Sequence, residues 1–285
     1  MTEPRRPNAD EIEYWNAEAA SRWTALYPRT DALFAEITAA ALDYASPQTG
    51  EHVLDVGCGC GATVLELVRR VGPGGRVVGI DVSTAMLGVA AERVRAARCA
   101  NVELLLTDAS MHPFEPATFQ LAFSRFGVMF FDDPVSAFAN IRRALRPGGR
   151  LVFISWRRPS ENPWLMLPFA AAKPHLPPQP PRGPDDPGPF AFADPDRVRH
   201  ILEAAGFTAV ELDQRDVGMR LGGPGGLDAA TEFAALIGPA SAALDGAGPG
   251  ARAAAKAAIH DELGQHVGPD GIVLPGSVWF VAARA

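Results

Sequence analysis

The sequence has few cysteines and no cluster of histidines, and both shortages exclude kinds of site. Its 285 residues include three cysteines, and Cys58 and Cys60 stand too close together for an unstrained mutual disulfide. We therefore expect free thiols. The six histidines are scattered singly, without the short ligand spacing of a zinc site, so no metal site is expected.

Excess positive charge and long apolar runs are also missing. The 26 Lys and Arg residues are outnumbered by 33 Asp and Glu residues, for a net charge of -7. Such a chain lacks the positive field that gathers nucleic-acid phosphates, so no nucleic-acid partner is expected. No window reaches the roughly 18 apolar residues of a membrane helix, and the first residues lack the apolar stretch of a secretory signal. We expect a cytoplasmic protein without a membrane partner.

What the sequence does have is a regular alternation of short apolar runs and amphipathic segments. Since 47% of its residues are hydrophobic, the chain can bury a full core. Runs that are apolar throughout are typical of strands buried on both faces of a parallel sheet, so the fold class is α/β. The expected strands are HVLDV, RVVGID, VELLLTD, FQLAFS, RLVFISW, Thr208–Leu212 and the final SVWFVAARA, with helices at 63–70, 84–95, 134–146 and after Asp194.

The segments outside this alternation predict a single domain, 1–285, with additions. Residues 1–47 form an N-terminal helical cap, 48–156 a ligand-binding core, and 194–285 the rest of the sheet with a helical insertion. Residues 157–193 contain KPHLPPQPPRGPDDPGPF, whose prolines oppose both helix and strand pairing, so a Pro-rich insertion in the form of a loop is expected there. Between 222 and 275, short helices are expected around 228–237 and 250–265.

A glycine-rich turn follows the first strand, in VLDVGCGCG at 53–61. Glycines let the backbone turn tightly and leave no Cβ between it and a ligand. The N-terminus of the helix that follows is suited to a carboxylate, and Asp55 offers the opposite charge to an ammonium group.

Two further acids end the second and third strands. Asp81 can accept hydrogen bonds from both hydroxyls of a ribose. Asp108, with the amide of Ala109, can address an adenine, and Met86 can pack on the face of that ring. Simpler roles stay open: a helix cap for Asp81 and a turn residue for Asp108.

The segments VLDVGCGCG, VVGIDVS, LLLTDAS and LRPGGRLVFISW resemble the serial motifs of class I S-adenosylmethionine-dependent methyltransferases, nearest in style to the ubiquinone/menaquinone-biosynthesis type. The resemblance is close over 50–156 and continues in ADPDRVRHILEAAGFTAVEL. It implies a Rossmann-like, seven-stranded, mostly parallel sheet with the last strand antiparallel and helices on both faces. It also implies S-adenosylmethionine as cofactor and S-adenosylhomocysteine as product.

Carried over to these positions, the resemblance assigns the methionine part to Asp55 and the glycines, the ribose to Asp81, the adenine to Asp108 and Ala109, and the sulfonium end to Ser124 and Arg125. Trp15, with Tyr14, can close over the cofactor or pack in a core. The full expected cofactor set is Tyr14, Trp15, Asp55, Gly57, Cys58, Gly59, Gly61, Asp81, Val82, Met86, Asp108, Ala109, Ser124 and Arg125.

Other functions compete with methyl transfer. The spacing Gly57-x-Gly59-x-x-Ala62 also fits a loose dinucleotide fingerprint, which would make the chain an NAD(P)-dependent oxidoreductase. Asp55 argues against that function, because a carboxylate sits badly beside a pyrophosphate. A protein of this fold that uses the cofactor for binding or for a non-methyl reaction is the third possibility.

The methyl acceptor is expected at the carboxyl ends of the strands. Phe126, Met129, Phe130 and Trp156 suggest an apolar wall for a small, partly apolar or aromatic metabolite, although some of them can simply pack the sheet. The atom methylated, O, N or C, is left open. No catalytic residue is assigned, because His112 fits a solvated loop better than a general base. The sequence leaves monomer and homodimer both possible.

Overall fold

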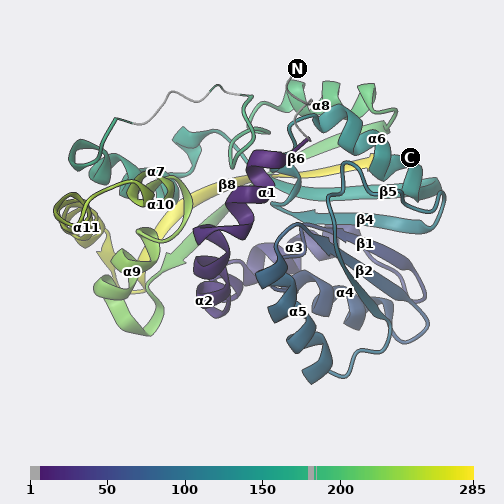
Figure 1. The fold of residues 1–285 in the computed structure, drawn as a ribbon, viewed down its shortest axis with the longest axis horizontal. Helices are drawn as coiled ribbons and strands as arrows, with labels where there is room; N and C mark the ends of the chain where they lie inside the picture. Colours follow the sequence, from purple (N-terminus) through teal and green to yellow (C-terminus); the bar gives the residue numbers. More distant parts are fainter. Residues whose placement is uncertain (1–6, 179–182, 184) are drawn as a thin grey trace, which may run out of the picture. The chain divides into compact units, whose positions relative to one another are not determined.

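A mixed sheet organises the chain in the computed structural model, which describes residues 7–178, 183 and 185–285 (Figure 1). Along the sheet the strand order is β3-β2-β1-β4-β5-β8-β6, and the short β7 pairs with β8 in antiparallel fashion. The strands are β1 His52–Val56, β2 Arg76–Asp81, β3 Val102–Leu106, β4 Phe119–Arg125, β5 Leu145–Trp156, β6 Thr208–Leu221, β7 Val267–Gly268 and β8 Gly271–Arg284.

The pairings confirm the predicted fold class. Strand β1 pairs in parallel with both β2 and β4, and the pairs β2–β3 and β4–β5 are also parallel. The sheet is thus mostly parallel with an antiparallel edge, and helices lie on both sides of it. The chain order reverses between β1 and β4, and ligands of open α/β sheets bind beyond the carboxyl ends of the strands at such a reversal.

Contacts divide the chain into two compact units, and β6 and β8 are each shared between them. The first unit comprises Met1–Ser155, Asp185–Asp213 and Trp279–Ala285, and the second comprises Trp156–Pro184 and Gln214–Val278. The predicted division into one domain with a cap and insertions stays a prediction.

Helices of the first unit cover both faces of its part of the sheet. Helix α4, Ala62–Val71, and α5, Thr84–Ala96, lie on one face, and α6, Pro134–Ala144, and α8, Pro195–Ala204, lie on the other (Figure 1). In α4 the buried Val64, Leu67 and Val71 recur every three or four residues, so a single apolar stripe faces the strands.

Residue types at the helix ends explain several boundaries. The Asp133 side chain accepts a hydrogen bond from the Ser136 N–H at 3.0 Å at the start of α6, with Pro134 at the first helical position. Helix α6 ends at Ala144, earlier than expected, because Leu145 already pairs with Phe119 of β4. The expected strand RLVFISW is therefore the second part of a longer β5.

The N-terminal region is helical, as the sequence predicts. It forms α1 Ala9–Asn16, α2 Glu18–Leu33 and α3 Ala35–Ala45. Helix α3 is the most buried of them, with Ala41 and Leu42 completely covered, and it contacts β4. This contact places α3 beside the strand that ends in Arg125.

The prediction of a loop over 157–193 is wrong for its first part. The structure has short 3-10 turns at Pro159–Glu161 and Lys173–His175 and, between them, helix α7, Pro163–Ala172. Pro163 occupies the first helical position, where no amide donor is lost, and Trp164, Leu165 and Pro168 are buried. Burial of this apolar segment outweighs the cost of the internal proline. The prolines at 179–182 and 184 lie outside the described residues.

Helix α7 packs against α10, Gly238–Asp245, and α11, Pro249–Gly264, in the second unit, and α11 also packs against α9, Gly226–Ala234. The sequence predicts α9 and α11 but not α10, whose Gly-Pro start reads as a turn. Strands β6 and β8 extend beyond the segments expected from the sequence. Within the described residues, no helix combines the length and the apolar character that a membrane crossing requires.

Candidate functional site

The glycine turn after β1 uses its glycines for backbone geometry. Gly57, Gly59 and Gly61 all have positive φ angles, of 70°, 53° and 82°. A Cβ on Gly57 would lie 2.8 Å from the Cα of Gly127, which follows β4. The two loops therefore touch backbone to backbone. Sequence reasoning missed Gly127, because nothing in SRFGVMF indicates that its partner is a glycine in another loop.

Most N–H groups of the turn are already engaged within the protein. Gly57 and Cys58 donate to the Ile80 carbonyl at 2.9 and 3.0 Å, and Gly61 donates to the Cys58 carbonyl at 2.9 Å. Gly59 donates to Oδ2 of Asp81 at 2.8 Å. These donors shape the turn, and the first turn of α4 keeps the free N–H groups that begin any helix.

Asp55 lies at the end of β1 and is completely buried. The Thr63 hydroxyl donates to its Oδ2 at 2.5 Å, whereas its Oδ1 has no hydrogen-bond partner. Burial raises the pKa of this carboxyl to about 7, opposed by the Thr63 hydrogen bond and the charge of Arg125. An ammonium group at this position would supply the missing donor and favour the charged form.

Asp81 ends β2 and connects two loops. Its Oδ1 accepts from the Ser83 N–H and its Oδ2 from the Gly59 N–H, both at 2.8 Å. Burial raises the pKa of Asp81 against these two bonds. The capping residue of α5 is Ser83, because its side chain accepts from the Met86 N–H. Asp81 thus holds the glycine turn against the start of α5.

Asp108, which follows β3, has both carboxylate oxygens engaged. The Asn8 side-chain amide donates to each of them at 3.0 Å, and the Ser110 N–H donates to Oδ1 at 2.8 Å. Asn8 also exchanges two hydrogen bonds with Asp132, at 2.6 and 2.7 Å. The Asn8 amide thus donates to the Asp108 carboxylate, which is the acceptor expected for the adenine amino group. Sequence reasoning missed Asn8, which lies 100 positions away from Asp108.

Asn8 precedes the first residue of α1, and the last residue of the helix, Asn16, also forms hydrogen bonds to a strand-end loop. The Asn16 side chain donates to the Val82 carbonyl at 2.8 Å and accepts from the Thr84 N–H at 3.1 Å. The Trp15 ring meets the Phe130 ring edge to face at 5.2 Å, while Tyr14 is 37% exposed. Helix α1 is therefore attached to the loops that follow both β2 and β3.

The end of β4 carries a strained residue and a partly buried cation. Phe126 has a φ of 65°, a conformation rare for a bulky side chain and enriched at functional sites. Before it, the Arg125 guanidinium donates to the Thr38 hydroxyl at 2.8 Å and lies 5.5 Å from the centre of the Phe34 ring. Burial lowers the pKa of Arg125, and the charges of Asp31 and Asp55 oppose this effect. Ser124 is buried and donates to the Val56 carbonyl at 2.7 Å.

Of the remaining expected cofactor residues, Met86 lies close to the turn. Met86 is buried, and its sulfur would lie 3.9 Å from a Cβ on Gly59. Ala109 is buried, and its carbonyl accepts from the Asn140 side chain at 2.8 Å. All three cysteines are free, as expected. Burial raises the pKa of Cys58 and raises that of Cys60 to about 12, so both stay protonated thiols at neutral pH.

The four residues expected to form the apolar wall are not equivalent. The rings of Phe126 and Phe130 contact Phe34 and Trp15, which come from the N-terminal helices. Met129 is only 1% exposed and packs in the core. Trp156 belongs to the second unit, where its ring packs against that of Trp164 at 5.0 Å.

His112 sits on the loop after β3, where its Nδ1 lies 3.2 Å from the Thr107 hydroxyl. Its ring also packs edge-on against that of Phe114, with centroids 4.6 Å apart. Both contacts are local and fit the loop role that the sequence favours.

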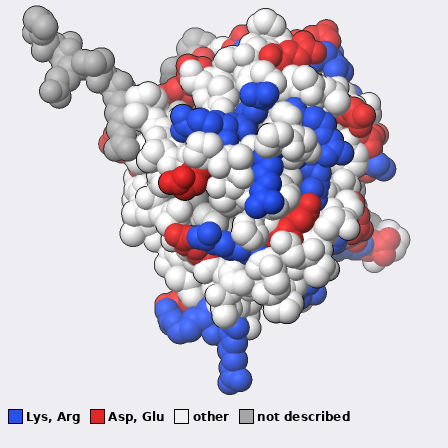
Figure 2. Space-filling view, turned by 90° about the vertical axis from the view of Figure 1, so that its right-hand side faces the viewer, with Lys and Arg blue, Asp and Glu red and all other residues white. Residues whose placement is uncertain are grey.

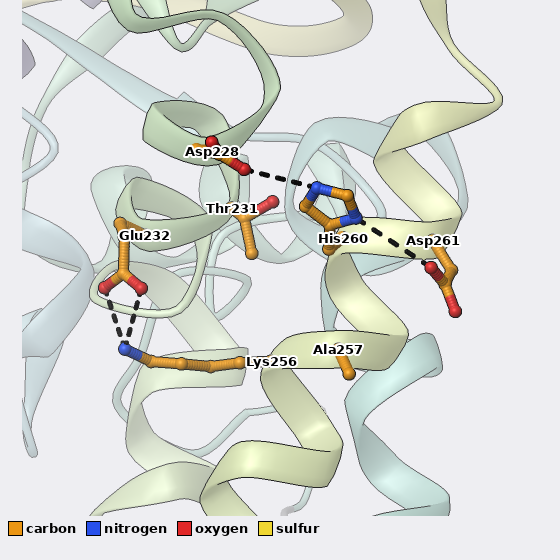
Figure 3. Close-up of a pocket in the computed structure, with 7 residues that line it drawn as sticks. All are labelled: Asp228, Thr231, Glu232, Lys256, Ala257, His260 and Asp261. Carbon is orange, nitrogen blue, oxygen red and sulfur yellow. Dashed lines mark hydrogen bonds and ion pairs between the residues drawn. The ribbon is translucent and has the colours of Figure 1, made fainter.

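A groove of about 390 Å³ in the second unit contains none of the expected site residues (Figure 3). Its polar side chains pair with one another: Lys256 with Glu232 at 2.7 Å and the His260 ring with Asp228 at 3.3 Å. The Asp228 side chain is 92% exposed. Solvent screens these groups, so the groove offers no buried chemistry.

Comparisons with known proteins agree with this geometry. The family model described as "Methyltransferase domain" matches residues 53–149. Nocamycin O-methyltransferase of Saccharothrix syringae is 31% identical over 195 residues, which cover 66% of this chain and 70% of that protein. Aklanonic acid methyltransferase DauC of a Streptomyces species is 36% identical over 40% of this chain, and the match spans 52% of that relative.

The demethylmenaquinone methyltransferase of Lactococcus lactis is 35% identical over 39% of this chain and 44% of its own length. The chain thus spans about half the length of several curated relatives that it matches.

Solved structures share the fold. Phosphoethanolamine N-methyltransferase 2 of Haemonchus contortus superposes with a TM-score of 0.59 at 19% identity, covering 100% of this chain and 61% of that one. The [4+2]-cyclase SpnF superposes with a TM-score of 0.54 at 22% identity, covering 87% of this chain and 80% of that one.

The glycine turn follows β1, Asp55 and Asp81 stand at the ends of β1 and β2, and Asp108 follows β3. A relative 31% identical is matched over 70% of its length. The chain therefore belongs to the class I S-adenosylmethionine-dependent methyltransferase family.

Proposed function

We propose that the protein transfers a methyl group from S-adenosylmethionine to a small, partly apolar or aromatic metabolite. One observation carries the proposal: Asp55 and Asp81 stand at the carboxyl ends of β1 and β2, Asp108 follows the neighbouring β3, and the glycine turn lies beside the first two acids. Carboxylates in a row at one edge of a sheet match the ammonium, ribose and adenine groups along an extended adenosyl cofactor.

The residues fit this cofactor chemically. The unpartnered Oδ1 of Asp55 suits the ammonium group, and the buried Asp81 carboxylate suits the ribose hydroxyls. Asp108 and the Ala109 amide would address the adenine once Asn8 shares or releases the carboxylate. The two solved forms of the Haemonchus contortus enzyme contain S-adenosylmethionine or S-adenosylhomocysteine, which supports the same ligand here.

The bound cofactor would supply a methyl group already activated by positive sulfur. What the chain has to do is align the acceptor with the methyl–sulfur bond and keep water away. Ser124 is fixed by its hydrogen bond to Val56 at the end of β4, and Phe126 and Phe130 bring apolar surface to the same region. These residues would position the acceptor and would not take part in the reaction themselves. No general base is assigned.

The names of the relatives support a small-molecule acceptor. Two are named for nocamycin and aklanonic acid, and a third for demethylmenaquinone. The apolar rings at the end of β4 agree with an acceptor that is partly apolar or aromatic. The atom methylated is left open, because O-, N- and C-methylation place similar demands on alignment.

Partners other than this metabolite are not part of the proposal. Figure 2 displays Lys and Arg side chains gathered on one face of the molecule, with Asp and Glu among them. The net charge of -7 therefore does not describe every face, and the expectation that there is no nucleic-acid partner stays a prediction.

A second candidate is a reaction other than methylation. The [4+2]-cyclase SpnF has the same fold, so the fold does not by itself determine the reaction. In that case the protein would bind S-adenosylhomocysteine but would form none from S-adenosylmethionine with any acceptor.

The test has two steps. Titration calorimetry with S-adenosylhomocysteine, NADH and NADPH should detect binding of the first ligand alone, and binding of a dinucleotide instead would overturn the proposal. Mass spectrometry should then detect S-adenosylhomocysteine when S-adenosylmethionine is mixed with a panel of phenols, enols and quinols. Cofactor binding without product across such a panel would favour the second candidate.

A further inference from the structure

Asn8 lies against the acid that is expected to bind the adenine. Its amide nitrogen, Nδ2, is 3.0 Å from each oxygen of the Asp108 carboxylate and 3.0 Å from the Ser110 hydroxyl oxygen. A nitrogen at equal distances from the two oxygens lies midway across the carboxylate, and the Ser110 N–H takes a further position on Oδ1. The Asn8 amide thus donates at the position where the adenine amino group is expected to donate.

The two donors are chemically alike. The amide nitrogen of asparagine and the exocyclic nitrogen of adenine are both uncharged NH2 groups with two N–H donors. Each gains a charge-assisted hydrogen bond from a carboxylate. Because one carboxylate cannot receive two nitrogens at the same midpoint, a bound adenine and the observed position of the Asn8 amide exclude each other.

A second acid fixes the orientation of the Asn8 side chain. Its Oδ1 accepts from the Asp132 N–H at 2.7 Å, and its backbone N–H donates to Oδ2 of Asp132 at 2.6 Å. Because Asp132 engages the amide oxygen, the amide nitrogen faces Asp108. Asn8 is only 5% exposed and has a φ of 55°, a conformation that asparagine adopts more readily than most residues. The contact with Asp108 is therefore buried and held from two sides.

Asn8 connects loops on the two sides of the point where the strand order reverses. Asp108 follows β3 and Asp132 follows β4, and β2 and β1 lie between these two strands in the sheet. Ligands of open α/β sheets bind at such a reversal, so the start of α1 bridges the edge of the sheet where the cofactor is expected. At its other end α1 is held by Asn16 against the loop after β2.

We propose that Asn8 competes with the cofactor: its side-chain amide takes the place of the adenine amino group on Asp108, and the cofactor binds as Asn8 gives up that carboxylate. This inference rests on the proposed function and adds a residue that lowers cofactor affinity. It also makes Asn8 a determinant of how strongly the site prefers a 6-amino purine to a 6-oxo purine. The alternative is that Asn8 stays in place and orients Asp108 for the adenine. The two roles predict opposite effects of removing the Asn8 amide.

Two ligands separate these roles in calorimetric titrations of the full chain. S-adenosylhomocysteine carries the 6-amino group, whereas S-inosylhomocysteine carries an oxygen there that cannot donate to Asp108. Asn8→Gly removes the amide and accommodates the positive φ. This variant should bind S-adenosylhomocysteine about 10 times more tightly than the wild type does, because the amino group no longer has to replace an existing charge-assisted hydrogen bond. Its affinity for S-inosylhomocysteine should not rise, so the ratio of the two affinities should increase.

Two further variants test the same contact from other sides. Asp132→Ala removes the acceptor of the Asn8 N–H and leaves Asp108 untouched, so it should raise the ratio by a smaller factor. The matched control is Asn16→Ala, which releases the opposite end of α1 and removes none of the bonds of Asn8. This control should keep the wild-type ratio. Each ratio compares two ligands on one protein sample, so a partly unfolded variant still gives an interpretable result.

The outcomes distinguish this inference from the proposed function. Weaker binding of S-adenosylhomocysteine by Asn8→Gly, with a lower ratio, would overturn the inference and make Asn8 a positioning residue for Asp108. An unchanged ratio would overturn it as well, even if both affinities rose, because loss of the amide would then act only by loosening α1. The proposed function survives both of these results. If neither the wild type nor any variant bound either ligand, the proposed function itself would fail.

Discussion

The end of β1 and the groove between α9 and α11 both contain charged residues, but they treat charge in opposite ways. Asp55 is buried and Arg125 is partly buried; the two do not contact each other, and each has unused hydrogen-bonding capacity. In the groove, Lys256 and Glu232 pair directly at the surface. A buried charge with an unpaired atom therefore marks a ligand site better than a hollow in the surface does, because solvent already hydrates the charged side chains of the groove.

The largest expected effect comes from filling the contact between the two loops at the end of β1 and β4. Gly57→Ala adds a Cβ 2.8 Å from the Cα of Gly127 at a positive φ. Backbone strain and overpacking together should cost about 3–5 kcal/mol of unfolding free energy in urea titrations. Gly50→Ala is the control, because it has φ +85° and no atom within 4 Å, and it should cost about 1–2 kcal/mol. Equal losses would show that the loops do not press on each other.

The next effect is the pH dependence of stability caused by Asp55. Its pKa rises from 3.8 to about 7 on folding, so the folded state binds the extra proton. Between about pH 4 and pH 7 this residue should therefore remove stability as pH rises, by up to about 4 kcal/mol. Urea unfolding of Asp55→Asn should lack this part of the decline. If Asp55→Asn had the same pH dependence of unfolding free energy as the wild type, ionisation of Asp55 in the folded protein would cost little stability.

Asp81→Ala should have a smaller effect, which is a loss of affinity for the ligand. Loss of its charge-assisted hydrogen bonds to ribose should weaken S-adenosylhomocysteine binding by about 1.5–3 kcal/mol in calorimetry. The variant also loses the hydrogen bonds that Asp81 accepts from Gly59 and Ser83, so thermal unfolding of the variant should be measured to check that it is folded. Unchanged affinity in a folded variant would remove Asp81 from the ribose site.

The smallest effect should come from the groove. Glu232→Ala removes the partner of Lys256, whose side chain is 39% exposed. Screened surface pairs contribute about 0–1 kcal/mol, so stability should change little and S-adenosylhomocysteine affinity should not change. A clear loss of affinity would show that the groove between α9 and α11 takes part in ligand binding.

Sequence reasoning succeeded where a local rule decides the structure. The Asp133-Pro134 pair and Ser83 mark the starts of α6 and α5 through bonds made within three residues. Sequence reasoning failed where two interacting residues are far apart in the chain, or where burial of apolar side chains overrides the low helix propensity of proline. Asn8 meets Asp108 from 100 positions away, and α7 forms despite Pro168 because its apolar side chains are buried.

The sequence alone determined the alternation of strands and helices, the glycine turn and the acids at the strand ends, because each depends on residues a few positions apart. Tertiary structure alone decided that Gly127 meets Gly57, that Asn8 donates to Asp108, and that the partly buried Arg125 lies near Asp55 without bonding to it. These relations arise when the sheet brings the ends of distant strands together. Their energies depend on burial and distance, which no local pattern of residues encodes.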